Sequence, residues 1–221
     1  MMDISKERKR RVKILFCKIS SMKYYKGVCQ SDQAFNGGSY VLENGFGHEE
    51  FNFFPIHMET DQMVCFGFVE PKSNRGRTNT LHIEKIEGCA LLKKEPVVED
   101  VLVVWCATRE RGDTTVVGWY KHAEVWRDLQ PWIVTWDDGS EEERYYNVMA
   151  SAKDCTLLPQ GERNLHKWWV PTAQYTRSFG FGQSMVWYPV QDEAKDYLRK
   201  LVDSIEGYSG ENWLERYPNQ L

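Results

Sequence analysis

The sequence has no apolar run that approaches the roughly 18–20 residues needed to cross a bilayer. Residues 1–11 have neither the apolar core nor the small-residue cleavage site of a secretory signal. We therefore expect a cytoplasmic protein with no membrane contact. The cysteines lie far apart, with no C-x-x-C pair and no Cys/His cluster at zinc spacing. We expect them to be reduced, and we predict no metal site.

The short motifs of common enzymes are also missing. The sequence contains no Walker loop, no dinucleotide fingerprint, no Gly-x-Ser-x-Gly elbow and no HNH-type metal constellation. His48 is followed four residues later by Asn52 rather than by a second histidine, and the acidic run 141–143 falls on a predicted turn. We therefore predict no catalytic residue and no cofactor. A small nucleic-acid-processing enzyme stays as an alternative, because His122 and Glu124 would share one strand face as an acid–base pair.

Charge is nearly balanced over the chain, with a formal net charge of -4. This balance argues against non-specific nucleic-acid binding by the whole surface but leaves room for local basic patches. Two stretches are basic, and their candidate phosphate contacts are Arg10 and Arg11 in residues 6–13 and Lys72, Arg75 and Arg77 in the loop 71–80. The alternative is that both stretches are only solvated.

Hydrophobic patterning indicates an α+β protein. Apolar, β-branched runs predict paired strands at 101–108 and 115–126, joined by a charged hairpin tip at 109–114. Further strands are predicted at 12–19, 63–69, 81–86, 132–136 and 144–150, the last two joined by an Asp138-Gly139 turn. Apolar residues at three-and-four spacing predict a helix at 192–206 that packs on the sheet. With no repeat and no linker visible, we expect a basic tail at 1–11 and a single domain at 12–221.

The hairpin region carries a resemblance to a known family. The letters concerned are Glu99 and Asp100, the run Val101–Trp105, Val116-Val117-Gly118, Ala123-Glu124-Val125 and Asp128. They resemble the central hairpin of the PUA-like superfamily, whose EVE and YTH branches read modified nucleotides. The resemblance implies a PUA-like fold, with a strongly bent mixed sheet or a small β-barrel. Over most of residues 12–214 the chain is also similar to an uncharacterised bacterial family associated with modification-dependent restriction.

These resemblances imply a function as well as a fold. The chain would be the reader part of a bacterial defence or restriction system, and it would recognise a modified, methylated base that has been flipped out of its strand. DNA is favoured over RNA as the nucleic-acid partner. An effector nuclease would be a partner or a fused domain.

A reader of this kind needs aromatic faces above and below the base and polar groups at its edge. Stacking contributes about 1–3 kcal/mol per base, which offsets the few kcal/mol that extrusion costs. Our candidates are Trp119, Tyr25, Trp168 and Phe181 for the aromatic pocket, and Ser20, Ser21 and Asn36 for the base edge. Ser20 and Ser21 follow the first strand, where the EVE and YTH branches have a Lys-Ser step at the base pocket.

Two alternatives remain open at this stage. Each aromatic residue could instead fill the core, which is the commoner role of such side chains. The chain could also be a protein–protein interaction module that uses exposed aromatic residues and its acidic carboxy-terminal helix.

Overall fold

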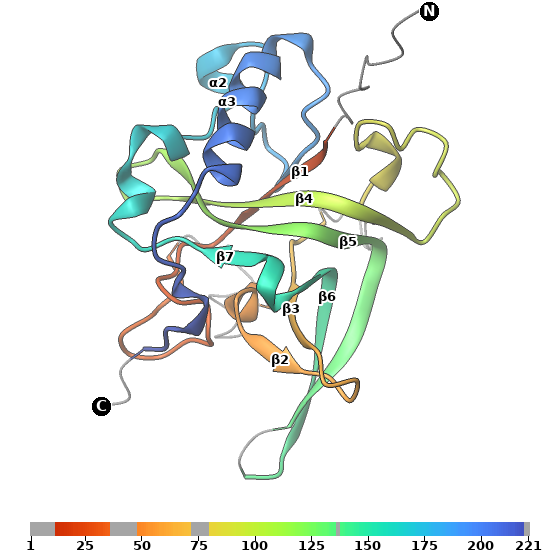
Figure 1. The fold of residues 1–221 in the computed structure, drawn as a ribbon, viewed down its shortest axis with the longest axis vertical. Coiled ribbons are helices and arrows are strands. Elements are labelled where there is room, and N and C mark those ends of the chain that lie inside the picture. The colour runs from red at the N-terminus through yellow and green to blue at the C-terminus, as the bar shows by residue number, and fades with distance from the viewer. Residues whose placement is uncertain (1–11, 36–47, 72–79, 136–137, 219–221) are drawn as a thin grey trace, which may run out of the picture.

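An open mixed sheet of eight strands forms the centre of the protein (Figure 1). The computed structural model describes residues 12–35, 48–71, 80–135 and 138–218. The strand order is β2-β3-β6-β5-β4-β1-β8, and β7 pairs with β5. The strands are β1 (Lys13–Ile19), β2 (Pro55–His57), β3 (Met63–Gly67), β4 (Val97–Thr108), β5 (Thr114–Thr135), β6 (Glu141–Ser151), β7 (Cys155–Leu157) and β8 (Val186–Trp187). β1 runs parallel to β4, and the other described pairs are antiparallel.

Helices are few and short. α3 (Lys195–Glu206) follows the 3-10 turn η6 (Asp192–Ala194), which confirms the predicted carboxy-terminal helix. The remaining helical pieces are α2 (Ala173–Thr176), η1 (His48–Phe51), η2 (Ile83–Lys85), η3 (Ala152–Asp154), η4 (Glu162–Asn164), η5 (His166–Trp168) and η7 (Trp213–Glu215). Among the described residues, no helix combines the length and the hydropathy that crossing a membrane requires.

The bend of the sheet comes from β5. Its first part pairs with β4, from Thr114 to Trp126, and its second part pairs with β6, from Glu124 to Thr135. The β5–β6 hairpin therefore projects away from the body of the protein (Figure 1). β2 and β8 stand at the two ends of the strand order, so the described strands form a bent open sheet. The α+β class is confirmed, whereas the expectation of a small closed barrel is wrong.

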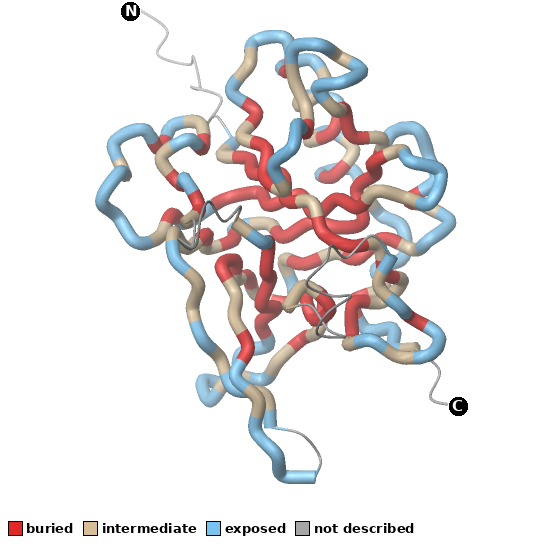
Figure 2. The backbone as a smooth tube through the Cα atoms, turned by 180° about the vertical axis from the view of Figure 1, so that it is seen from behind, coloured by how far each residue is buried: buried red, intermediate tan, exposed pale blue. Residues whose placement is uncertain are grey.

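Both faces of the central strands are buried. Along β1, Leu15, Cys17 and Ile19 join one apolar cluster, while Ile14 and Phe16 join a second cluster on the opposite face. β4 divides in the same way, which explains why its sequence is apolar without alternation. α3 covers the second cluster with Leu201 and Ile205. Figure 2 shows the buried residues concentrated along these strands and the exposed residues at the hairpin ends.

The strand predicted at 81–86 is wrong. The segment contains the 3-10 turn η2, and Leu81, Ile83 and Ile86 are buried from it. The polar residues His82 and Glu84 stand between these apolar residues, so the sequence alternates as it would in a strand. In the structure Glu84 forms an ion pair with Arg127, with 2.8 Å between Arg127 Nη1 and Glu84 Oε2. The strands predicted at 12–19, 63–69, 101–108 and 144–150 are confirmed as β1, β3, β4 and β6, within a few residues at their ends. The separate strands predicted at 115–126 and 132–136 are wrong in their division, because both belong to the one continuous strand β5. The PUA-like assignment and the division into a tail and one domain stay predictions.

Candidate functional site

A pocket of about 740 Å³ opens where three segments distant in the sequence meet. These are residues 21–35 after β1, the β4–β5 hairpin tip with the start of β5 (109–117), and residues 160–164 around η4. We call it the hairpin-tip pocket. Its volume lies within the roughly 300–1,000 Å³ of typical ligand sites. Four basic side chains line it, against two acidic ones: Lys23, Arg109, Arg111 and Arg163, with Asp32 and Glu110.

Two buried charged residues hold the wall that follows β1. The Asp32 carboxylate accepts hydrogen bonds from the backbone N–H groups of Lys23 (2.6 Å), Tyr24 (2.7 Å) and Tyr25 (3.3 Å). The Arg163 guanidinium donates to the carbonyl oxygens of Met22 (2.7 Å), Lys23 (2.8 Å) and Leu158 (2.8 Å). Because these bonds fix the backbone at both its N–H and its C=O groups, the wall is set before any ligand binds.

Arg163 is therefore a structural residue of the pocket wall. Its side chain comes from η4 and is almost fully buried. Burial lowers the pKa of its guanidinium. An arginine nevertheless remains charged in proteins, and the three carbonyl groups supply acceptors for its Nε, Nη1 and Nη2 atoms.

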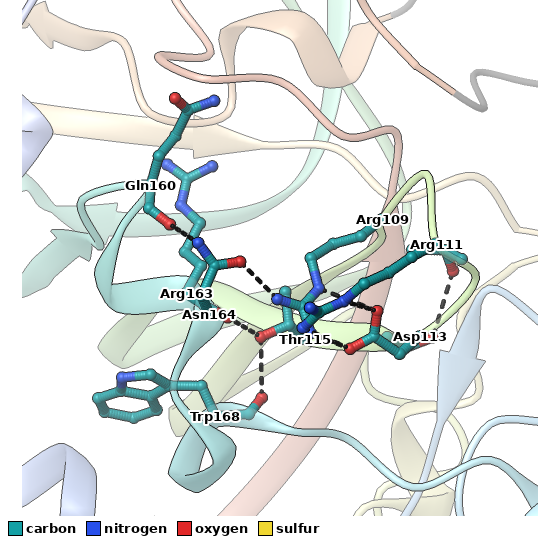
Figure 3. Close-up of polar contacts among 10 residues, drawn as sticks. Arg109, Arg111, Asp113, Thr115, Gln160, Arg163, Asn164 and Trp168 are labelled. Atoms are coloured by element: carbon teal, nitrogen blue, oxygen red, sulfur yellow. Dashed lines mark hydrogen bonds and ion pairs between the residues drawn. The ribbon is translucent and has the colours of Figure 1, made fainter.

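The hairpin tip presents two arginines that share one carboxylate. Arg111 Nε lies 2.8 Å and Arg109 Nε 3.1 Å from Asp113 Oδ1, and both residues donate to Asp113 Oδ2 as well. Arg109 Nη1 also donates to Asn164 Oδ1 at 2.6 Å, which joins the tip to η4 (Figure 3). Burial, and then the charge of Arg111, lowers the pKa of Arg109.

Neutral groups complete the pocket. Gln33 and Gln160 carry exposed amide side chains, which can both donate to and accept from a ligand. The amide of Asn164 is engaged, because its oxygen accepts from Arg109 and its nitrogen donates to the carbonyl of Gln160 at 3.2 Å. Phe35 lies at the rim with 40% of its surface exposed, and backbone hydrogen bonds with Ser21 of 2.8 and 2.9 Å hold it there. The buried residues Met22 and Val117 add apolar atoms to the lining.

Of the predicted base-edge residues, Ser21 lines the pocket. Ser20 is buried, and its hydroxyl and backbone N–H both donate to Glu49 Oε1. Burial raises the pKa of Glu49. Asn36 lies outside the described residues, as do the predicted phosphate contacts Arg10, Arg11, Lys72, Arg75 and Arg77.

The four predicted pocket aromatics are buried, and none of them lines the hairpin-tip pocket. Tyr25 belongs to the first apolar cluster, and its hydroxyl donates to the carbonyl of Ser20 at 2.9 Å. Trp119, Trp168 and Phe181 belong to the second cluster. Trp119 and Trp168 stack on each other with ring centroids 5.4 Å apart, while Phe181 packs against Phe16 and Trp187.

The sequence did not single out the main lining residues. Arg109 and Arg111 stand in the charged tip that the pattern predicts, and Asn164 follows a glycine that opens a loop. Their polar character is typical of solvated turns. Only the contact between residue pairs as distant as Met22 and Arg163 reveals a shared site.

The side chains of His122 and Glu124, considered above as an acid–base pair, have separate partners in the structure. His122 Nδ1 lies 2.8 Å from Asp100 Oδ1, and both residues have positive φ angles, of 51° and 59°. Glu124 instead lies near Glu99, and burial followed by the charge of Glu99 raises its pKa. Within the parts of the chain that the structure describes, no three His, Cys, Asp or Glu side chains gather as a potential metal site.

Comparisons of this chain with protein-family models, with curated proteins and with solved structures found no match.

Proposed function

We propose that this chain binds nucleic acid and accommodates one unstacked nucleotide in the hairpin-tip pocket. The observation that carries the proposal is the excess of basic over acidic side chains lining this pocket, on a chain whose formal net charge is -4. A polyanion is attracted to such a local positive region even when the rest of the surface repels it.

The neutral groups of the pocket suit a base. The exposed ring of Phe35 offers a stacking face, and such contacts contribute about 1–3 kcal/mol per base. The amides of Gln33 and Gln160 can pair with the donors and acceptors of a base edge. A pocket wall already fixed by Asp32 and Arg163 needs little further ordering on binding, which favours affinity.

A preference for a modified base is part of this proposal. A methyl group on the base would lie against the apolar atoms of Met22 and Val117. Burying that surface contributes about 25 cal/mol per Å², so one methyl group changes affinity by a small factor rather than by orders of magnitude. DNA as the nucleic acid, and an effector nuclease as partner or fused domain, stay proposals that rest on the resemblance of the hairpin region.

The test is a binding titration with short labelled oligonucleotides. Single strands and duplexes would be compared, each unmodified, methylated at adenine or cytosine, or hydroxymethylated, at two salt concentrations. We expect salt-sensitive binding that is tightest for one modified single strand. Phe35→Ala should weaken it by about 1–3 kcal/mol, the contribution of one stacking contact.

A matched control is Tyr175→Ala, which removes a ring that is 71% exposed on α2. This variant should bind like the unaltered protein. If Phe35→Ala binds as tightly as Tyr175→Ala, Phe35 does not stack on a base, and the proposed position of the base in the pocket is refuted. Absence of measurable binding to every oligonucleotide would refute the proposed function as a whole.

A further inference from the structure

We infer that Lys23 is the pocket residue that contacts a phosphate of the bound strand, and that the stacked rings of Tyr24 and Trp213 hold its ammonium group in position for that contact. The inference rests on the proposed function, since it concerns the backbone of a nucleotide bound in the same pocket. Beyond the proposed function, it identifies the positive charge that contacts the phosphate and the aromatic rings that position this charge.

The other three basic residues of the pocket are already engaged. Arg109 and Arg111 both donate to the carboxylate of Asp113, so a ligand anion would compete with an anion of the protein itself. Arg163 is buried, and its donors are directed at backbone carbonyl groups. A phosphate reaching any of these residues would have to replace existing hydrogen bonds.

Lys23 differs from them, because no described carboxylate pairs with its side chain. Its Nζ lies 4.7 Å from the ring centroid of Tyr24 and 5.8 Å from that of Trp213. The two rings are stacked, with centroids 5.5 Å apart and an interplanar angle of 20°. A cation over an aromatic face is stabilised by the ring quadrupole without losing its positive charge, so it can still attract a phosphate.

The carboxy-terminal segment that carries Trp213 is anchored on both sides of this residue. Asn212 accepts a hydrogen bond from the backbone N–H of Leu157 at 2.9 Å and donates to the carbonyl of Cys155 at 2.9 Å. Leu214 is buried, and its carbonyl accepts from Lys26 Nζ at 2.7 Å. Trp213 stands between these two anchored residues. The segment after α3 therefore contacts Lys23, a residue of the pocket wall, through the ring of Trp213.

A positioned ammonium group makes a specific prediction about the ligand. Lys23 lines the pocket while its Nζ is held beside Tyr24 and Trp213. The phosphate that it contacts belongs to a linkage next to the nucleotide in the pocket. Because the side chain is already ordered in the free protein, it loses little freedom when the phosphate binds.

The first experiment measures oligonucleotide affinity against salt concentration for the unaltered protein, Lys23→Gln and the control Lys200→Gln. Lys200 lies on α3, with 68% of its side chain exposed. Lys23→Gln should weaken binding about fivefold at 0.1 M salt, because one phosphate contact contributes a slope of about 0.7–0.9 in log K against log salt. The slope itself should fall by about that amount, while Lys200→Gln should leave both quantities unchanged.

The second experiment tests the role of the rings and the identity of the phosphate. Trp213→Leu should weaken binding about twofold with the slope unchanged, because the charge remains but is no longer held, and Trp213→Phe should restore the affinity. Replacing one phosphate by an uncharged methylphosphonate, scanned along the oligonucleotide, should identify a linkage at which Lys23→Gln causes no further loss. Melting temperatures would confirm that each variant is folded.

The possible results separate the two proposals. If the unaltered protein binds and Phe35→Ala weakens it, but Lys23→Gln changes neither affinity nor slope, the role of Lys23 is refuted and the proposed function stands. If the unaltered protein binds no oligonucleotide, the proposed function is refuted, and the role of Lys23 is refuted with it. An equal slope change for Lys23→Gln and Lys200→Gln would mean general electrostatic attraction only, and would also overturn the inference.

Discussion

Trp119 and Trp168 stack inside the protein, with ring centroids 5.4 Å apart and less than 3% of either residue exposed. Trp119 lies on β5 and Trp168 in η5, so the pair joins the sheet to the segment that covers it. Tyr208 packs its ring edge-on against both indoles. The two residues therefore act as core side chains in this structure.

Trp168→Ala should lower the free energy of unfolding by about 3–5 kcal/mol, because it removes a large buried ring and leaves a cavity. Urea denaturation followed by circular dichroism measures the change. Tyr175→Ala is the control, because Tyr175 is 71% exposed, and a surface substitution of this kind usually changes stability by less than about 0.5 kcal/mol. A Trp168→Ala protein as stable as this control would contradict the burial of the pair.

Arg163→Met should destabilise the protein by about 3 kcal/mol or more. The substitution leaves the carbonyl groups of Met22, Lys23 and Leu158 without their charged donor, and each such bond is worth about 1.5–3 kcal/mol. Faster hydrogen exchange in residues 20–25 would report loosening of the pocket wall. Arg199→Met on α3, where 61% of the side chain is exposed, should change neither measurement.

Lys26 should make stability rise with pH above about pH 8. Burial lowers the pKa of its amine from 10.5 to about 8, although the amine donates to the carbonyl groups of Phe53 and Leu214. Between these two pKa values the unfolded chain binds one more proton than the folded protein. The free energy of unfolding therefore gains about 1.4 kcal/mol per pH unit from this group.

The measurement is the difference in unfolding free energy between the unaltered protein and Lys26→Met at several pH values. Taking the difference removes the contributions of the cysteine and tyrosine residues that titrate in the same range. The difference should shift by about 3 kcal/mol in favour of the unaltered protein between pH 8 and 10.5. A difference that stays constant over this range would show that the folded-state pKa of Lys26 is not lowered.

Arg144 and Glu50 form an ion pair of which each side chain is only 5% exposed, with 2.7 Å between Arg144 Nη1 and Glu50 Oε1. Arg144→Met should cost about 3–5 kcal/mol, because it leaves the buried carboxylate without its partner. Burial raises the pKa of Glu50, and the hydrogen bond from Arg144 opposes that rise. The loss in Arg144→Met should therefore be smaller at acidic pH, where Glu50 accepts a proton more readily.

A double-mutant cycle with Glu50→Met tests this pair. Adding Glu50→Met to Arg144→Met should recover most of the lost stability, because two apolar side chains replace two buried charges. Strictly additive losses in the double variant would show that the two residues do not interact.

The sequence by itself determined the elements whose patterns are local. Paired strands follow from the apolar, β-branched runs of β4 and the first part of β5, and the position of α3 follows from the spacing of Leu198, Leu201 and Ile205. These patterns depend on burial within each element, which recurs at a fixed period along the chain. The same reasoning failed at 81–86, where buried residues at short spacing belong to a 3-10 turn.

Only the tertiary structure decided how these elements combine. Pairing of β1 with β4 in parallel joins segments more than eighty residues apart, and the partner change of β5 bends the sheet. The hairpin-tip pocket needs Lys23, Arg111 and Asn164 to meet, which no local pattern records. Aromatic residues show the limit most clearly, because a ring has the same favourable contacts in a core as in a binding site. The sequence pointed to the aromatic residues as candidates for a binding site. Their neighbours in space place Trp119 and Trp168 in the core and Trp213 beside the ammonium group of Lys23.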